Sequence, residues 1–231
     1  MKRKIFLIYL FASLFVLTAL YGERTVQAES ISKAGTAQQA VQNKSGWVKE
    51  YGLWFYYENS VKKTGWIKDG GQWYYMDKST GYMQTGWLED GYNTYYLDET
   101  SGAMKTGWFF DGYSWYFFES SGAMKTGWLL NGGSWYYLDQ ELGFMHTGEV
   151  HDGYNLYYLD TKSGAMKTGW VYDGSGWMYF NANGTGHTGW LKDGGVWYYL
   201  YPDLYYMVTG WWPIDGKWHY FNNKGVWQYS E

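Results

Sequence analysis

The sequence predicts an all-β fold in which nine β-hairpin units of about 20 residues stack into a solenoid. A Gly-Trp step, usually preceded by Thr, recurs at almost constant intervals along most of the chain. Asp-Gly or Asn-Gly pairs, which are typical of tight hairpin turns, separate runs rich in aromatic residues. The 231 residues include 17 Trp, 27 Tyr and 11 Phe, and these rings would be the main apolar material of the stack.

The N-terminal segment has the pattern of a secretory signal peptide. Met1-Lys2-Arg3-Lys4 is basic, residues 5–20 are mostly apolar, and Val26-Gln27-Ala28 ends in a small residue. The apolar run is shorter than the roughly 20 residues that span a bilayer. We expect residues 1–28 to be a signal peptide, residues 29–45 to form a flexible spacer and residues 46–231 to hold the repeats.

The repeats follow one another without a gap. Aligned on the Gly-Trp step, consecutive units lie 19 to 21 residues apart. A constant period of this length indicates that a unit cannot bury its own apolar face and must stack on its neighbours. The nine aligned glycines are Gly46, Gly65, Gly86, Gly107, Gly127, Gly148, Gly169, Gly189 and Gly210.

Each unit has the plan of a hairpin. In the second unit, Asp69-Gly70-Gly71 separates Trp66-Ile67-Lys68 from the aromatic run Gln72 to Met76. Asp, Asn and Gly tolerate the backbone conformations of tight turns, so we interpret these aspartates as turn residues and not as catalytic acids. The pair recurs as Asp90-Gly91, Asp111-Gly112, Asn131-Gly132, Asp152-Gly153, Asp173-Gly174, Asp193-Gly194 and Asp215-Gly216.

Composition and charge exclude several functions. The chain has no cysteine, which excludes disulfides, zinc-thiolate sites and thiol nucleophiles. Without residues 1–28 it carries 14 Lys and Arg against 21 Asp and Glu, and this acidic balance argues against nucleic-acid binding and against stable membrane association. The four histidines lie in different units, and no non-repeat segment could hold a catalytic domain. We expect no enzyme activity, no metal and no cofactor.

The repeats carry a recurrent pair of tryptophans. The Trp of the Gly-Trp step is followed seven residues later by a second Trp, across the predicted turn, in seven of the nine units. In the second strand, Trp73 and Tyr75 point to one face and Tyr74 to the other. The pairs are Trp47 and Trp54, Trp66 and Trp73, Trp108 and Trp115, Trp128 and Trp135, Trp170 and Trp177, Trp190 and Trp197, and Trp211 and Trp218.

Stacked units would bring such a pair against a tyrosine of the next unit, with a methionine on the fourth side. Several ring faces around one space form an aromatic cage that suits a quaternary ammonium group, because the cation is attracted to each ring and its methyl groups contact carbon. The other interpretation is a hydrophobic stacking core that binds no ligand. Physical reasoning alone leaves both open.

The units, for example Thr64-Gly65-Trp66 through Trp73-Tyr74-Tyr75 to Gly81-Tyr82-Met83, resemble the cell-wall-binding repeats of streptococcal choline-binding proteins. The resemblance covers residues 46–231 in nine copies. It implies a left-handed solenoid of hairpins, with choline of teichoic and lipoteichoic acids bound between successive units. It also implies that two Trp of one unit and a Tyr of the next form the cage, commonly with a Met.

Applied to this chain, the resemblance assigns choline-binding residues to six interfaces. The four complete sets are Trp66, Trp73, Met83 and Tyr96; Trp108, Trp115, Met124 and Tyr137; Trp128, Trp135, Met145 and Tyr158; and Trp190, Trp197, Met207 and Tyr220. Two sets have three walls, namely Trp47, Trp54 and Tyr75, and Trp170, Trp177 and Tyr199, because Lys62 and Gly186 stand at the methionine position.

Three units depart from this pattern. The third has Thr94 in place of the second Trp, which predicts a weak site. The sixth has Glu149 and Leu156 in place of both, which predicts no site. The ninth has its Trp pair but no following unit, and Trp227 stands at its methionine position, so we expect it to be a cap.

The sequence therefore predicts a secreted, non-enzymatic protein that binds choline or phosphocholine at the wall of a Gram-positive bacterium. It could compete with wall hydrolases or present a surface to a host partner, and it names no protein partner. The alternative is a glucan or other carbohydrate binder, because sugar rings also stack on Trp and Tyr. Sugars, however, require hydrogen-bonding side chains beside the rings.

Overall fold

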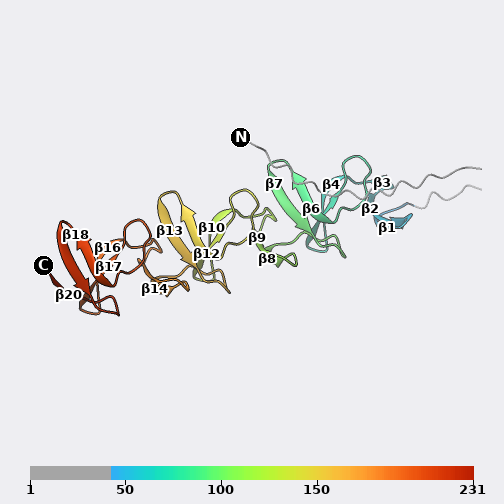
Figure 1. Ribbon diagram of the computed structural model, residues 1–231. Coiled ribbons are helices and arrows are strands. Elements are labelled where there is room, and N and C mark those ends of the chain that lie inside the picture. Colours follow the sequence, from blue (N-terminus) through green and yellow to red (C-terminus); the bar gives the residue numbers. More distant parts are fainter. Residues whose placement is uncertain (1–42) are drawn as a thin grey trace, which may run out of the picture. The chain divides into compact units, whose positions relative to one another are not determined.

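The computed structural model describes residues 43–231, and these residues form an all-β repeat structure of 20 strands (Figure 1). The predicted signal peptide and most of the predicted spacer lie outside the described residues. Within residues 43–231 the nine predicted hairpins are all present, so the predicted fold class is confirmed. In this part of the chain no helix has the length and apolarity needed to cross a membrane.

The hairpins, numbered one to nine along the chain, are short antiparallel pairs. The first contains β1 (Gly46–Glu50), β2 (Leu53–Glu58) and the short β3 (Val61–Lys62); the ninth contains β18 (Gly210–Ile214), β19 (Lys217–Phe221) and β20 (Trp227–Ser230). The seven others are β4 (Gly65–Asp69) with β5 (Gln72–Met76), β6 (Gly86–Asp90) with β7 (Asn93–Leu97), β8 (Gly107–Phe110) with β9 (Trp115–Phe118), β10 (Gly127–Asn131) with β11 (Ser134–Leu138), β12 (Gly148–Asp152) with β13 (Asn155–Leu159), β14 (Gly169–Tyr172) with β15 (Trp177–Phe180), and β16 (Gly189–Asp193) with β17 (Val196–Leu200).

In the second to ninth hairpins the turn contains the Asp-Gly or Asn-Gly pair that predicted it, and in the first hairpin it is Tyr51-Gly52. In the second hairpin Gly70 and Gly71 have φ of 55° and 84°, values that L side chains adopt only at a cost. The two glycines let β4 and β5 reverse direction over two residues, so that Asp69 pairs with Gln72.

The register divides each hairpin into two faces. In the second hairpin Trp66 is opposite Tyr75, and Ile67 is opposite Tyr74. Residues that lie directly opposite in an antiparallel pair point to the same face. Trp66, Trp73 and Tyr75 therefore lie on one face, and Tyr74 lies on the other with Ile67.

The core contains one recurrent residue from the end of each second strand. These side chains are almost or fully buried, and the backbone of the following loop pairs with them; Met83, for example, forms a bridge with Met76. In the second to ninth hairpins they are Met76, Leu97, Phe118, Leu138, Leu159, Phe180, Leu200 and Phe221, all with 0% exposure. These recurrent buried residues thus stabilise hairpins that would be marginal alone.

A longer period of three hairpins is superimposed on the single repeat. Trp66, Trp128 and Trp190 are each separated by 62 residues, and the tips of their hairpins share two successive glycines. Figure 1 shows the same orientation at every third hairpin, for example at β6–β7 and β12–β13. Hairpins three and six, which lack a complete Trp pair, therefore occupy equivalent positions in this longer repeat.

Candidate functional site

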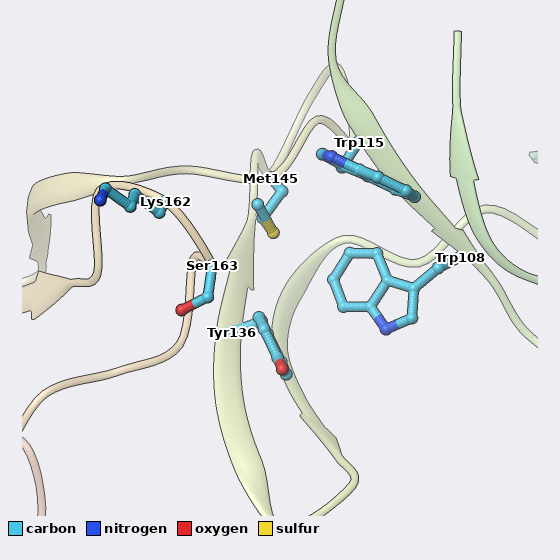
Figure 2. Close-up of a pocket in the computed structure, with 6 residues that line it drawn as sticks. All are labelled: Trp108, Trp115, Tyr136, Met145, Lys162 and Ser163. Atoms are coloured by element: carbon cyan, nitrogen blue, oxygen red, sulfur yellow. The ribbon is translucent and has the colours of Figure 1, made fainter.

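The fourth hairpin shows how a cage is assembled. Its two indole rings, Trp108 and Trp115, have centroids 6.4 Å apart and planes at 84°. Tyr136 of the fifth hairpin lies 4.9 Å from Trp108, and Met145 closes the space between them (Figure 2). The cavity has a volume of about 330 Å³ and is open to solvent on one side. We use the word cage for this set of two Trp, one Tyr and one Met, numbered by the hairpin of its Trp pair.

The hairpin register explains this geometry. Trp108 and Trp115 are on adjoining strands and point to the same face of β8–β9, so their rings can meet at a right angle. Tyr136 is on the opposite face of β10–β11 from Trp128, and therefore points back to the fourth hairpin. The amide of Met145 donates a 2.7 Å hydrogen bond to the carbonyl of Trp115, which fixes the methionine at the edge of the indole pair.

A third hairpin completes the cavity. Lys162 and Ser163, from the loop after β13, lie across the cavity from the two indole rings (Figure 2). The next residue, Gly164, has φ of 73°, and a Cβ at this position would overlap the sulfur of Met145. The loop can lie against the methionine only because this residue is glycine.

Two other cavities have the same construction. The first cage has a cavity of about 350 Å³ and the seventh one of about 400 Å³. Loop residues two hairpins further along line each of them, as in the fourth cage. The residues are Trp47, Trp54, Tyr74, Met83, Thr100 and Ser101 in the first, and Trp170, Trp177, Tyr198, Met207, Asn223 and Lys224 in the seventh.

The second and fifth hairpins make the same contacts. Trp66 lies 4.8 Å from Tyr95, and the amide of Met104 donates to the carbonyl of Trp73 at 2.8 Å. In the fifth, Trp128 lies 4.6 Å from Tyr157, and Met166 donates to the carbonyl of Trp135 at 2.7 Å. Five of the nine hairpins therefore have the complete set of cage residues.

An Asp or Asn of the next hairpin's turn holds the first Trp in each of the five cages. The indole Nε1 of Trp128 donates to Asp152 Oδ2 at 2.9 Å, from one hairpin to the turn of the next. Asn131 has the same role for Trp108 at 3.2 Å. Sequence reasoning assigned these residues to the turns only, although their regular separation of 22 to 24 residues from the Trp could have indicated this contact. The other pairs are Trp47 with Asp69, Trp66 with Asp90, and Trp170 with Asp193.

We expect Asp152→Ala to weaken the fifth cage, because Trp128 loses the acceptor that fixes its ring. The free energy of unfolding should fall by about 1.5–3 kcal/mol, the usual effect of removing a hydrogen bond to a charged group. Binding of a cation at the fifth cage should also weaken severalfold, as measured by calorimetry. Asp152→Asn is the matched control, because Asn131 already performs this function. Equal losses in both variants would contradict the role of the hydrogen bond.

The arrangement of the cages suits a cation that carries methyl groups. The walls are ring faces and a thioether, and the second Trp of each pair remains partly exposed, for example Trp115 at 44%. A quaternary ammonium group has no proton to donate, so it gains from ring faces and carbon contacts and loses little by leaving water. Among residues 43–231 no group of three or more His, Cys, Asp or Glu is placed to hold a metal ion.

Comparison with known proteins identifies the repeats. A model of the choline-binding repeat matches residues 63–109 and 105–149, and a model of the putative cell wall binding repeat matches residues 168–185, 188–203 and 209–226. The chain belongs to the choline-binding repeat family. This membership associates it with choline-dependent binding at the bacterial cell wall surface.

Solved structures from Streptococcus pneumoniae have the same repeat fold. The choline-binding domain of CbpL is 28% identical with a TM-score of 0.61, and the match covers 81% of this chain and 99% of that domain. CbpJ is 27% identical with a TM-score of 0.60 over 79% of this chain and 93% of that one. Choline binding protein F, solved with a peptidoglycan analogue, is 28% identical with a TM-score of 0.59 over 80% and 86%. The curated proteins give no match.

The structure groups the predicted choline-binding residues differently in two respects. The Tyr of each cage is the first of the Tyr-Tyr pair, as with Tyr136, and not the second, as with Tyr137. The second tyrosine shares a face with the Trp pair of its own hairpin, and its ring packs into the core. The predicted residues that belong to their own hairpin in this way are Tyr75, Tyr96, Tyr137, Tyr158 and Tyr199. Four of them have ring centroids 5.0 to 5.3 Å from the Trp of their own hairpin. Tyr158, whose hairpin has no Trp, is buried.

The methionines are displaced by one hairpin. Met145 completes the fourth cage and not the fifth, and Met207 completes the seventh and not the eighth. Met83 likewise belongs to the first cage, and Met124 donates to the carbonyl of Thr94 at the third interface. The reason is that the loop after a hairpin folds back over the preceding Trp pair. Met104 and Met166, which sequence reasoning omitted, follow the same rule.

The first, seventh and eighth sites therefore also differ from the predicted sets. Lys62 and Gly186 are not the fourth walls of the first and seventh cages, which have Met83 and Met207 and are therefore complete. In the eighth, Trp190 faces His219 at 5.2 Å and Trp227 at 6.2 Å. Trp227 Nε1 donates to His219 Nδ1 at 3.1 Å. Tyr220 packs instead on Trp211 of its own hairpin at 5.2 Å.

The third interface keeps one indole. Trp87 lies 4.9 Å from Tyr116, and Met124 occupies the usual position, so only the second Trp is missing, at Thr94. This arrangement agrees with the weak site that the sequence predicts, and its choline binding stays a prediction.

The sixth interface is filled by the protein itself. Leu156 is 3% exposed and packs with Met178, against Tyr205 and Tyr206. Gly186 stands where other hairpins have the cage methionine, and a Cβ there would lie 2.7 Å from Tyr205 Cδ1. Tyr205 in turn stands where other loops have glycine, and it keeps a φ of 62°.

A hydrogen bond also fixes Tyr206, the residue next to Tyr205 in this filled interface. Tyr206 Oη donates to Asp173 Oδ2 at 2.6 Å, and this bond, together with burial, raises the pKa of Tyr206 to about 12. The side chain of Glu149 is exposed. The sixth interface therefore differs from the others in packing as well as in composition.

Proposed function

We propose that the chain is a secreted, non-enzymatic surface protein that is held on the cell wall by choline of teichoic and lipoteichoic acids. The observation that carries this proposal is the repetition of one geometry: hairpins one, two, four, five and seven each present two Trp, one Tyr and one Met around the same space. A stacking core without a ligand does not need open cavities of about 330 to 400 Å³ lined by ring faces.

Attachment would depend on several weak sites acting together. A cation over one aromatic ring gains about 0.5–2 kcal/mol, so a single cage binds free choline weakly. Linked sites on one chain and one polymer can strengthen binding by roughly 10² to 10⁴ without any new contact. Five cages on a single solenoid are consistent with retention on a polymer that carries many choline groups.

The cages favour choline over a sugar. Their walls are Trp, Tyr and Met, and the polar side chains at the rim of the fourth cavity belong only to Lys162 and Ser163. A sugar ring would need several hydrogen-bonding partners around the stacking platform, because its hydroxyl groups lose water on binding. We propose that the wall-bound chain competes with wall hydrolases for choline or presents a surface to a host partner.

The secreted chain is expected to be retained on a quaternary-amine resin and to elute with free choline. Dextran should not elute it, because the glucan does not fit a cage built for a cation. A choline titration should change the tryptophan fluorescence, since every cage contains two indole rings. Elution by dextran with no response to choline would favour the carbohydrate-binding alternative.

Enzyme activity is tested with the same preparation. We expect purified walls incubated with the chain to release no soluble sugar or peptide. Release that persists in a chain with its cages disrupted would contradict the non-enzymatic part of the proposal and leave the choline binding intact.

A further inference from the structure

The rim of each open cavity is formed by two residues that precede a loop glycine, two hairpins after the Trp pair. At the first cage these residues are Thr100 and Ser101, which are uncharged. At the fourth they are Lys162 and Ser163, and at the seventh Asn223 and Lys224. The fourth and seventh cavities therefore each have a lysine among their rim residues, whereas the first has none. In Figure 2 the side chain of Lys162 extends away from the rings, with its ammonium group at the outer end.

The serines and the lysines at the rim differ in whether their polar groups already have partners. Ser163 Oγ donates to Asp160 Oδ1 at 2.9 Å, and Ser101 Oγ donates to Asp98 Oδ1 at 2.9 Å, so both hydroxyl protons are used within their own loops. Among residues 43–231 neither Lys162 nor Lys224 takes part in an ion pair, whereas Lys167 is paired with Asp160 at 2.9 Å. Both rim lysines are exposed and available to a bound anion.

The chemistry of esterified choline matches this arrangement. Its trimethylammonium end carries a positive charge and apolar methyl groups and fits the rings. Its phosphate end is anionic and is joined to the ammonium end by a two-carbon link. An ammonium group is a good point-charge partner for phosphate. A cage with a lysine at its rim can therefore contact both ends of the ligand, and a cage with a threonine can contact only one.

We propose that Lys162 and Lys224 form phosphate subsites, so that the fourth and seventh cages select phosphocholine over free choline. The inference rests on the proposed function, because it assumes that the cages bind the ammonium group. The first cage, with Thr100 at the rim, has no such preference. One chain thus contains cages of two kinds, and the Lys-bearing cages recognise the esterified form of choline that a polymer or a lipid presents.

The test compares choline with phosphocholine at single cages in the full chain. The indole ¹⁵N–¹H signals of Trp115, Trp177 and Trp54 report the fourth, seventh and first cages separately. Lys162→Ala should lower the ratio of phosphocholine to choline affinity at the fourth cage about two- to fivefold, the usual size of an exposed charge pair. Lys224→Ala should do the same at the seventh. The preference should also shrink in high salt.

Two further variants control for structural effects. Lys167→Ala lies in the same loop but its ammonium group is paired with Asp160, so it should change neither affinity. Thr100→Lys places a lysine at the position of Lys162 and should give the first cage a preference for phosphocholine.

The outcomes separate the two proposals. If choline does not bind any cage, the proposed function is wrong. If choline binds and the ratio of the two affinities is the same in the parent chain, Lys162→Ala and Thr100→Lys, only the phosphate subsites are overturned. Purified choline-bearing walls and phosphatidylcholine vesicles identify the source: lysine-dependent binding to walls assigns the subsites to the wall polymer, and lysine-dependent binding to vesicles assigns them to a lipid headgroup.

Discussion

Replacing Gly186 by Met in an otherwise unchanged chain is expected to lower the free energy of unfolding by about 2–3 kcal/mol. At other interfaces Met is the residue of this position, so the substitution restores the usual residue of the repeat. It is nevertheless unfavourable here, because even a Cβ would lie 2.7 Å from Tyr205 Cδ1 and 3.4 Å from Leu156 Cβ. Overpacking of a well-filled interior costs about 1–3 kcal/mol, and Tyr205 cannot withdraw without opening the interface.

Tyr205→Gly should compensate for the loss of stability that Gly186→Met causes. Tyr205→Gly removes the ring and places glycine where the φ of 62° requires it. Alone it should destabilise the chain, because the ring leaves a void beside Leu156 and Met178. When Tyr205→Gly is combined with Gly186→Met, the new methionine side chain fills that void. Urea unfolding of the four chains should give a coupling of about 0.5–3 kcal/mol in favour of the double variant. Independent, additive effects would show that Tyr205 does not fill the methionine position.

Tyr136→Ala is expected to weaken choline binding at the fourth cage so far that the measured stoichiometry falls by one. The ring is a wall of the cavity at 4.9 Å from Trp108, and it is only half-buried, so its loss should not unfold the hairpin. The cation loses about 0.5–2 kcal/mol of ring attraction and its apolar contact with that wall. Calorimetry gives the stoichiometry, and a crystal soaked with choline shows which site is empty.

Tyr157→Ala is the matched control for this experiment. It is the equivalent residue of the next cage, 4.6 Å from Trp128, and should empty the fifth site while the fourth remains occupied. Tyr137→Phe keeps the buried ring of the neighbouring position and removes only the hydroxyl that accepts a hydrogen bond from Gln140 at 2.8 Å. It should leave the stoichiometry unchanged. Continued occupancy between Trp108 and Trp115 in Tyr136→Ala would show that the structural grouping is wrong.

Much of the fold could be predicted from the sequence because its determinants are local. An Asp-Gly pair fixes the position of a turn, and the seven-residue spacing places both Trp of a pair on one face of the same hairpin. The substitutions at Thr94, Glu149 and Leu156 were visible in the same way. The third strands of the first and ninth hairpins, β3 and β20, were not predicted, because the pattern of a single repeat indicates only two strands.

The direction of stacking was decided only by the tertiary structure. A repeat pattern shows that Tyr136 and Tyr137 point to opposite faces, but not which face meets the preceding hairpin. That choice depends on how successive hairpins pack on each other, for example through the contacts of Tyr75 with Leu97 and Met104. Once it is made, the first tyrosine belongs to the preceding Trp pair and the second to the core.

The sequence by itself determined the hairpins, their number and the residue types that make an aromatic cage, because each of these depends on the chemistry of one unit. The tertiary structure decided which units share a cage: Trp from one hairpin, Tyr and Met from the next, and a rim from the one after that. It also decided that Tyr205 and Gly186, each unusual in its own unit, compensate for each other across an interface. Contacts of this kind join positions in different repeats, and no period within a single unit encodes them.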